Sequence, residues 1–524
     1  MSNVDPRWGA WAEPPPQVPA EEIARETTAD IVVVGAGIAG MSCALSAAQS
    51  GAEVTVLEQS GNWTARGMNI GIIDSGFLKE RGWDYSAEDV AREWIKLCGN
   101  RCDEKLVWLY LRNGGRAMDW LIEMLSRPEY RCNVAISSCV YQGEKHRELM
   151  ASHWFLDGPL AEKGDRQSVA QANYAMHSEG VKLGVKYLYK TRGEQLVKGA
   201  ERVTGVIAKD NDGYIKVNAR RGVVLATGDI SGNDEMCDDL APLANRCAKK
   251  ISWPKGANLG DGHRMGLWAG GSFEDAPFPS IIHPQAFGYL QYCFLYVRQD
   301  GTRFMNEDSF VQGKSLALLR NNEEYAWAVA DSDWPVKVPP TLKYGGGMFW
   351  GQDSFRGSEE PEFDLKQEQD MFDEGIKDGN IVTADTPEGL AEKMGVPPDT
   401  FAAEMKRYNE LCAAGADEDF GKRRELMIPL DKPPYFGMKF GPALLAVVGG
   451  LRVDTEMRVL DERGVPVGGL HAIGNTAGGR YGVDYPLHVP GNSCGSALTF
   501  GYLLGRSLAA GNRAAVTRGA AAVL

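Results

Sequence analysis

Three glycines and one acidic residue are spaced in this sequence as a dinucleotide phosphate site requires. Gly35, Gly37 and Gly40 follow the β-branched apolar run 31–34, and Glu58 closes the next apolar run. In this pattern the first glycine permits a tight turn, the second lets the backbone approach a pyrophosphate, and the third allows close helix–strand contact. The acid is placed to accept hydrogen bonds from ribose hydroxyls. The spacing therefore predicts a dinucleotide-binding strand–loop–helix–strand unit.

A second group of small residues follows Glu58. Gly67, Met68 and Asn69 lie in a loop that is rich in glycine and short polar side chains, where the backbone can run close beside a flat ligand. The flavin half of an FAD would extend to this point, but an ordinary glycine-rich loop explains the composition equally well. Thr227 and Gly228 end a later apolar run, beside the place where such a cofactor would be covered.

Hydrophobic periodicity indicates the elements that must position these residues. A helix is predicted from the glycine loop to Gln49, and an Asn-Asp-Gly turn at 211–213 predicts a hairpin. The other expected elements are strands at 31–34, 53–57, 202–209, 214–219 and 223–228, and helices at 87–98, 105–125, 265–269 and 498–508.

Changes in composition divide the chain into three parts. Residues 1–27 are proline-rich and predict an extended arm, and residues 276–435 are richer in proline, aromatic and acidic side chains. From residue 443 the sequence again has the strand-and-turn pattern of residues 28–275. We therefore expect one discontinuous cofactor domain, 28–275 and 436–524, interrupted by an inserted domain.

Charge and hydropathy limit the partners. The formal net charge of −14 disfavours nucleic acid and anionic membranes, and no apolar run approaches the ~18 residues of a membrane span. The N-terminus lacks the basic-then-apolar pattern of a secretory signal, so we expect a cytoplasmic protein. Trp8 and Trp11 could pin the arm onto the body or onto another subunit, which makes an oligomer possible.

Cysteine and histidine patterns predict no metal site. The ten cysteines include no CxxC pair, and the seven histidines form no cluster at ligand spacing. Without a secretory signal, the cysteines are expected to be reduced and mostly buried. Cys98 and Cys102 lie at helical spacing, and core packing is predicted for them rather than ligation.

Sequence blocks spread over nearly the whole chain after residue 28 resemble the flavoprotein family of fumarate reductase, succinate dehydrogenase and 3-ketosteroid dehydrogenase. They include DIVVVGAGIAG, VVLATGDISGN, DGTRFMNED and GNSCGSALTFGYLLGR. The resemblance implies an α/β fold: a Rossmann-like FAD domain with a parallel sheet, helices and a small antiparallel sheet, plus an inserted α+β cap. It implies non-covalent FAD held by Gly35, Gly37, Ile38, Ala39, Gly40, Glu58, Gln59, Arg66, Gly67, Met68, Asn69, Thr227, Gly228, Asp261, Asn475, Asn492, Ser496, Ala497 and Leu498.

Two departures from this family bear on the substrate. Val311 stands where fumarate reductases carry a catalytic arginine and ketosteroid dehydrogenases a tyrosine, four residues after Glu307. The stretch 478–492 is also altered where fumarate reductases hold a carboxylate with histidine and arginine. Without an arginine at these positions, no guanidinium group can bind a substrate carboxylate through two parallel hydrogen bonds. We therefore expect a protein closer to the ketosteroid dehydrogenases than to true fumarate reductases.

The resemblance leaves several candidates for handling the proton. They are Tyr481, Tyr485, His488 and His283. Tyr485 and His488 lie in the loop expected to face the substrate, and His283 stands in an Ile-Ile-His-Pro stretch similar to an active-site His-Pro. Gly491 would offer a backbone N–H to a substrate carbonyl at a helix N-terminus. Each side chain could instead serve packing.

The leading expectation is an FAD-dependent oxidoreductase that acts on CH–CH bonds. It would exchange hydride between flavin N5 and the carbon β to a carbonyl in a hydrophobic ring ketone or enone, with a separate electron donor or acceptor. One alternative is a fumarate-reductase-like enoate reductase that draws arginines from elsewhere, such as Arg66 or Arg480. Another is an FAD-binding electron-transfer subunit without its own small-molecule catalysis.

Overall fold

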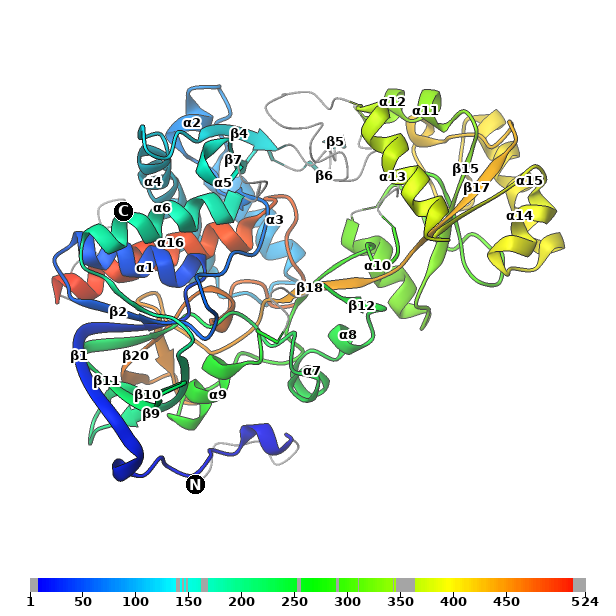
Figure 1. The fold of residues 1–524 in the computed structure, drawn as a ribbon. Helices are drawn as coiled ribbons and strands as arrows, with labels where there is room; N and C mark the ends of the chain where they lie inside the picture. Colours follow the sequence, from blue (N-terminus) through cyan, green and yellow to red (C-terminus); the bar gives the residue numbers. More distant parts are fainter. Residues whose placement is uncertain are drawn as a thin grey trace.

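The computed structural model describes residues 8–137, 142–143, 146–147, 149–161, 168–251, 256–288, 292–309, 311–342, 344 and 363–511. These residues form two lobes (Figure 1). The larger lobe, here called the body, holds both ends of the described chain and most of the helices. The smaller one, here called the second lobe, is built from the segment between β13 and β18, whose bounds are given below.

A mixed sheet forms the centre of the body. Its strands pair in the order β19–β20–β11–β1–β2–β8, with β10 beside β11 and β9 beside β10. The core pairs of β1 with β11, β1 with β2, and β11 with β20 are parallel. The bounds are β1 (Ile23–Val34), β2 (Val54–Leu57), β8 (Lys186–Leu188), β9 (Arg192–Lys198), β10 (Val203–Asp210), β11 (Gly213–Leu225), β19 (Arg458–Leu460) and β20 (Pro466–Ala472).

The strands differ from the prediction in length. The predicted hairpin is confirmed in β10 and β11, but the two strands expected at 214–219 and 223–228 are one continuous strand. Strand β1 begins at Ile23, not at residue 31, so the end of the predicted arm belongs to the sheet. Both strands extend because they pair with each other along their length, across an irregularity between Ala29 and Ile31.

Helices α1, α6 and α16 cover one face of this sheet (Figure 1). Two glycines bring α16 close to α1: a Cβ at Gly501 or Gly505 would clash with Ser42 or Ser46 of α1. Small residues on both helices therefore let the backbones approach without intervening side chains. The bounds of the helices in this layer are α1 (Ile38–Gln49), α4 (Glu104–Leu125), α6 (Ser168–Lys182) and α16 (Asn492–Ala510).

The second lobe has its own antiparallel sheet, in the order β14–β15–β17–β16. Its last strand, β17, ends at Phe440, five residues beyond the predicted end of the insert at residue 435. Residues Arg303, Glu307 and Asp417 form a buried ion cluster within it. The bounds are β14 (Leu295–Val297), β15 (Ala326–Asp331), β16 (Ile381–Ala384), β17 (Tyr435–Phe440), α10 (Val311–Arg320), α11 (Trp334–Lys337), α12 (Pro339–Leu342), α13 (Leu365–Lys377), α14 (Pro387–Met394) and α15 (Pro398–Ala414).

A small sheet joins the two lobes. Strand β13 leads from the body into the second lobe and β18 leads back, and the two pair antiparallel beside the short β12. The bounds are β12 (Lys249–Lys250), β13 (Ser280–His283) and β18 (Ala443–Val447). The other elements of the body are α2 (Gly76–Lys79), α3 (Ala87–Leu97), α5 (Gly158–Ala161), α7 (Asp234–Leu240), α8 (Pro242–Asn245), α9 (Asp261–Trp268), β3 (Ile70–Gly71), β4 (Asn133–Ser137), β5 (Gln142–Gly143), β6 (His146–Arg147) and β7 (Ser152–Leu156).

The described part of the N-terminal arm is fastened to its own body. Trp11 is buried, stacks on Trp8 with ring centroids 5.4 Å apart, and lies 6.3 Å from Phe273. Its indole N–H donates to Asp239 over 2.7 Å. Trp8 and Trp11 were expected to hold the arm against the body or against another subunit. The contacts that the structure describes are with the body of the same chain. Among the described residues, no helix has the length and hydropathy required to cross a bilayer.

We expect Trp11→Ala to lower the stability of the protein by about 3 kcal/mol, because it removes a buried indole and its hydrogen bond. The midpoint of urea unfolding measures this loss. Val336→Ala, at a side chain 73% exposed, serves as the control and should leave the midpoint unchanged. An unchanged midpoint for the Trp11 variant would mean that the arm does not pack as described.

Candidate functional site

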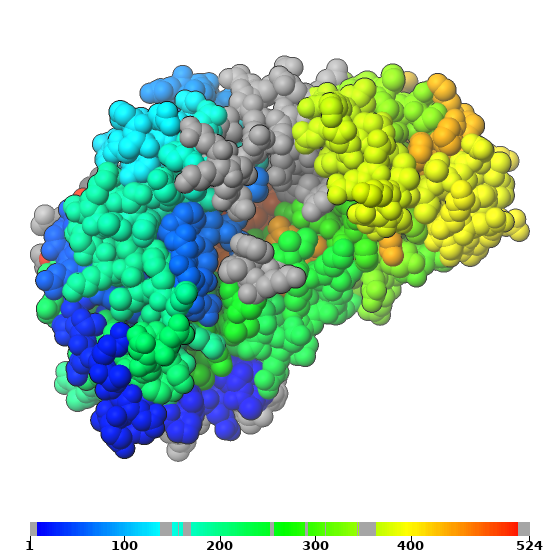
Figure 2. Space-filling view, viewed as in Figure 1, coloured from blue at the N-terminus to red at the C-terminus, as the bar shows by residue number. Residues whose placement is uncertain are grey.

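A cavity of about 920 Å³ lies at the carboxyl ends of the parallel strands and continues toward the second lobe. Loops after β1, β2 and β11 form its floor, and the first turn of α16 forms one wall. Gln367 and Met371 of α13 reach it from the second lobe, and Figure 2 shows the surface hollowed between the two lobes. This volume is at the upper end of the range of about 300–1,000 Å³ for cofactor and ligand sites.

In the turn after β1, the three glycines have the conformation, the close packing and the open space that their spacing predicts. Gly35 has a φ of +107°, and a Cβ there would clash with the carbonyl of Ala226. A Cβ on Gly40 would clash with the carbonyl of Gly35, so this position requires glycine for packing. A Cβ on Gly37 meets nothing within 4 Å, and Gly37 lines the cavity. The open space beside Gly37 therefore fits a ligand that approaches the backbone.

The first turn of α1 is suited to phosphate. Ile38 and Ala39 line the cavity beside Gly37, and the helix starts without any side-chain cap. Backbone N–H groups at such a helix start, together with the helix dipole, favour an anion. A pyrophosphate at this place would complete the hydrogen bonding of the turn.

Glu58 faces the cavity but is already hydrogen-bonded to the loops beside it. Its Oε2 accepts from the backbone N–H of Ala36 over 2.9 Å, and its Oε1 accepts from Ser60 over 2.8 Å. These bonds hold the glycine turn against the end of β2. A carboxylate has further lone pairs, so the same bonds orient Glu58 to accept from a ribose hydroxyl.

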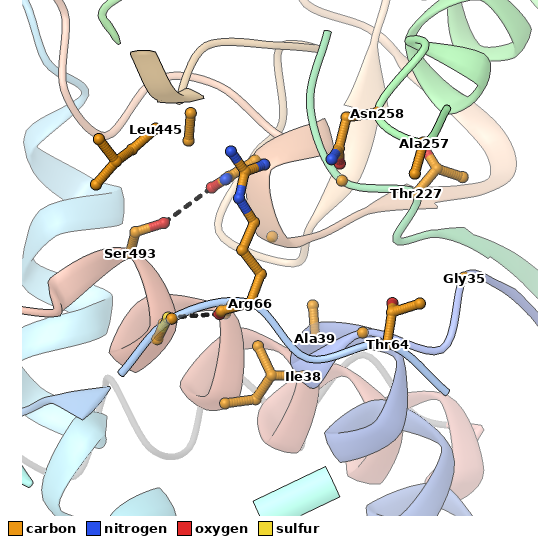
Figure 3. A pocket seen from close by; sticks show the side chains of 18 of the residues that line it. Gly35, Ile38, Ala39, Thr64, Arg66, Thr227, Ala257, Asn258, Leu445 and Ser493 are labelled. Carbon is orange, nitrogen blue, oxygen red and sulfur yellow. Dashed lines mark hydrogen bonds between the residues drawn. The ribbon is translucent and has the colours of Figure 1, made fainter. Parts of the chain in front are cut away.

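Arg66 crosses the cavity (Figure 3). One of its terminal nitrogens donates to the fully buried Asp229 over 2.8 Å, while the other is buried and has no partner. The side-chain oxygen of Asn69, also on the cavity wall, is buried without a partner as well. Buried polar atoms without partners are costly. A ligand that accepts from Arg66 and donates to Asn69, as a flavin ring with its carbonyl and N–H edge can, fits this wall.

A second ion pair lies on the cavity wall. Arg192 donates two hydrogen bonds to Asp261, over 3.0 and 2.7 Å. Asp261 was expected from the sequence, whereas Arg192 and Asp229 were not. Asp229 directly follows Thr227 and Gly228, so its place could have indicated it. Arg192 lies in β9 and carries no sequence signal.

The start of α16 forms the wall that would face a substrate. Gly491 has a φ of +76°, and within the described chain its N–H donates no hydrogen bond. The Tyr485 hydroxyl accepts from the backbone N–H of Ser493 over 3.1 Å, and the Ser493 hydroxyl donates to Asn475 over 3.0 Å (Figure 3). Burial raises the pKa of Tyr485 well above its usual value, so the phenol stays protonated.

Most of the expected residues meet at this cavity. Four of the cofactor candidates do not line it: Gly40 packs inside the turn, Asn492 and Ser496 bond within the chain, and Leu498 is buried in α16. Those that line it are Gly35, Gly37, Ile38, Ala39, Glu58, Gln59, Arg66, Gly67, Met68, Asn69, Thr227, Gly228, Asp261, Asn475 and Ala497, together with the catalytic candidates His283, Tyr485 and Gly491.

Tyr481 and His488, two of the catalytic candidates, lie away from the cavity. Both pack on Trp94 of α3: the Tyr481 ring stacks 5.8 Å from it and the His488 ring meets it edge-on at 5.9 Å. His488 also bonds to the carbonyl of Val90, and burial lowers its pKa to about 4. The loop 479–490 turns only part of its length toward the cavity, so proximity in sequence to Tyr485 does not bring these side chains to the site.

His283 lines the cavity from β13. Burial lowers its pKa to about 3, so the imidazole is neutral at physiological pH. It can therefore take part in hydrogen bonding but does not carry a charge to a substrate.

Val311, the departure from the family pattern, and Arg480, the arginine that an enoate reductase could draw on, are both buried away from the cavity. Val311 is the first residue of α10 and belongs to the core. Arg480 is 1% exposed and donates to the carbonyls of Gly474 and Ala477 and to the hydroxyl of Ser496. Arg480 therefore holds the loop in place. Among the described residues, no group of three or more His, Cys, Asp or Glu side chains is arranged to hold a metal ion.

Gly37 and Gly40 form a matched pair for testing the cofactor site. We expect Gly37→Val to leave the stability of the apoprotein unchanged and to weaken FAD binding, because the new side chain enters open cavity space. Gly40→Ala should lower stability, because its Cβ clashes with backbone. Flavin fluorescence titration and thermal unfolding separate the two effects. Equal FAD affinity of the Gly37 variant and the native protein would contradict this placement.

Comparison with known proteins identifies the family. The family described as "FAD binding domain" matches residues 30–493. The chain is 29% identical to vinyl phenol reductase from Lactiplantibacillus plantarum, over 93% of this chain and 97% of that one, and 27% identical to the cytochrome fumarate reductase of Shewanella frigidimarina, over 92% and 77%.

A solved structure confirms the fold. The 3-ketosteroid Δ1-dehydrogenase of Sterolibacterium denitrificans superimposes with a TM-score of 0.72 at 21% identity, covering 93% of this chain and all of that one. The α/β fold class and the resemblance to the fumarate reductase and ketosteroid dehydrogenase flavoproteins are therefore confirmed. This chain belongs to the FAD binding domain family and is an FAD-dependent oxidoreductase that acts on CH–CH bonds.

Proposed function

We propose that the protein interconverts a saturated ketone and the corresponding conjugated enone in a hydrophobic, uncharged small molecule. The observation that carries this proposal is the wall beyond the flavin position. It is lined by apolar side chains from both lobes, including Ile281, Met371, Leu445 and Leu487. The two cations among the described lining residues, Arg66 and Arg192, are each paired with an aspartate.

The geometry of Tyr485 and Gly491 supports a carbonyl-binding role. When bound, FAD supplies the hydride acceptor or donor at its N5 atom. The Tyr485 hydroxyl accepts from Ser493, which leaves its own proton free to be donated, and the Gly491 N–H donates to no other described atom. Two donors at a helix N-terminus would stabilise the negative charge that develops on a carbonyl oxygen. Neutral His283 borders the same space.

A carboxylate-bearing substrate is less well supported. An enoate reductase needs a free arginine, and Arg480 is enclosed while Arg66 is paired with Asp229. A second candidate is an alkene conjugated to a phenol ring, since the relative named vinyl phenol reductase matches this chain over nearly its whole length. Such a substrate is also hydrophobic and uncharged. A cytoplasmic location, a separate electron partner and an oligomer remain parts of this proposal.

We expect the chemically reduced holoenzyme to be reoxidised anaerobically by uncharged enones or vinylphenols, and much more slowly by fumarate. Flavin absorbance follows the reaction. Tyr485→Phe should slow this step about 10²-fold, because it removes a donor from developing charge. Tyr481→Phe is the matched control, since this ring packs on Trp94 outside the cavity. Faster reoxidation by fumarate than by every uncharged alkene would overturn the proposal.

Because of the carboxyl group of Asp484, we expect the rate of flavin reoxidation to depend on pH. Its carboxylate accepts from Gln312 of α10 and from the N–H of Tyr485, and burial raises its pKa to about 6. The ionised form, present above about pH 6, accepts these bonds more strongly. The rate should therefore fall as pH drops below about 6. In Asp484→Asn we expect no inflection at this pH and a rate lowered about tenfold, or ~1.4 kcal/mol in the barrier.

The pH profile is measured by stopped-flow reoxidation of the reduced enzyme. Asp378→Asn, at the end of α13 and outside the cavity lining, should leave the native profile unchanged. An inflection that persists in Asp484→Asn would assign the titration to another group.

A further inference from the structure

Gln312 lies in the first turn of α10 and connects two segments that border the cavity. Its side chain is 3% exposed and is not among the described residues that line the cavity. Its Oε1 accepts from the backbone N–H of Ile282 over 3.1 Å, and its Nε2 donates to the carboxylate of Asp484. Ile282 directly precedes His283 in the chain. Asp484 directly precedes Tyr485, so one buried amide holds both segments.

The two partners determine how this amide is oriented. A backbone N–H can only donate, and an ionised carboxylate can only accept. The side chain between them therefore has to offer one acceptor and one donor, which the glutamine amide does. A glutamate at this position would place two carboxylates in contact. A methionine would leave both buried partners without their hydrogen bond, which is costly.

The partners of the amide are themselves tied to the neighbouring candidate residues. The carboxylate of Asp484 also accepts from the N–H of Tyr485 over 2.7 Å, so one group joins α10 to the Tyr485 backbone. On the other side, the register of β13 with β18 shifts between Ile281 and Ile282. Irregularities of this kind re-aim side chains beside active sites. The residue that follows this one, His283, lines the cavity.

Helix α10 is fixed to both lobes, so the amide has a defined position. Val311 belongs to the core of the body and Leu318 to the core of the second lobe. Near the end of α10, Arg246 of the body donates to the carbonyl of Leu319 and, over 2.8 Å, to the side-chain oxygen of Asn322. The helix is therefore held at both ends. The two hydrogen bonds of the amide transmit its position to the segments that they hold.

We propose that Gln312 is a positioning residue for the oxidoreduction, which sets the places of His283 and Tyr485 relative to each other at the cavity. It does not touch the reacting atoms. The first turn of α10 thus contributes to the reaction through a buried amide, while the neighbouring Val311 contributes packing. The inference rests on the roles proposed above for Tyr485 and His283, but not on which alkene is the substrate.

Hydrogen–deuterium exchange of the FAD-loaded protein tests this connection without measuring activity. Gln312→Met removes both hydrogen bonds, and we expect exchange at least about tenfold faster in peptides covering 280–285 and in those covering 483–488. Gln369→Met is the matched control, because it removes a glutamine-to-aspartate hydrogen bond of 2.8 Å, to Asp373, on the exposed part of α13. It should leave both segments unchanged. Faster exchange in only one of the two segments, or in neither, would overturn the proposal.

Stopped-flow reoxidation of the reduced holoenzyme tests the effect on the reaction. The oxidant is the alkene that the native enzyme reduces fastest, so this result stays separate from the choice between enone, vinylphenol and fumarate. In Gln312→Met the rate constant at saturating alkene should fall about tenfold, since a small displacement of a donor is costly in the transition state. The alkene concentration for half-saturation should change less than about twofold. An unchanged rate constant, or a loss confined to half-saturation, would overturn the positioning role.

An exchange of the two side-chain types tests the hydrogen-bond pattern itself. Gln312→Glu alone places two carboxylates in contact and should slow reoxidation more than Gln312→Met does. In the double variant Gln312→Glu/Asp484→Asn, the new carboxylate can accept from the Ile282 N–H and from the new amide. The oxygen of that amide can still accept from the N–H of Tyr485. We expect the double variant to be about tenfold faster than Gln312→Glu. A double variant no faster than Gln312→Glu would overturn the assigned pattern.

Discussion

The close contact between α1 and α16 is the constraint on which the site depends. Gly501 and Gly505 pack against Ser42 and Ser46 with no room for a Cβ. The two helices run side by side, and both begin at the same cavity. One N-terminus therefore lies at the position proposed for the pyrophosphate and the other at the position proposed for a substrate carbonyl, so a single helix pair would supply both sets of backbone donors.

The two arginines of the cavity are neutralised locally. Asp229 neutralises Arg66 and Asp261 neutralises Arg192, although the whole chain carries a net charge of −14. Each pair is partly withdrawn from water, where a lone charge would be costly. The cavity consequently presents oriented dipoles and single hydrogen-bond donors to a ligand. That character suits a neutral conjugated system and a flavin ring better than a dicarboxylate.

Local patterns in the sequence predicted the parts of the site that are local in space. The glycine turn and Glu58 were expected because their roles depend on spacing within one strand–helix unit. The start of α16 was expected only from the family resemblance, since periodicity alone predicted a helix from residue 498 and the helix begins at Asn492. His488 was expected to face the substrate and Tyr481 to handle a proton, but neither lines the cavity, because alternate parts of one loop face Trp94 and the cavity. Arg192 was missed because its role depends on a strand that the sequence places far from Asp261. The continuous β11 was missed because its length follows from pairing with β1.

Strands β13 and β18 carry the chain out of the body and back into it, and they lie next to each other. The ends of the second lobe are therefore a strand spacing apart, and a segment with adjacent ends costs the surrounding fold little chain entropy to accommodate. Such a segment can be exchanged as a unit. A graft between β13 and β18 could carry Gln367 and Met371 out of the cavity with it, and supply other side chains over an unchanged FAD site. New substrate ranges could then arise by replacing the second lobe while the FAD site is kept.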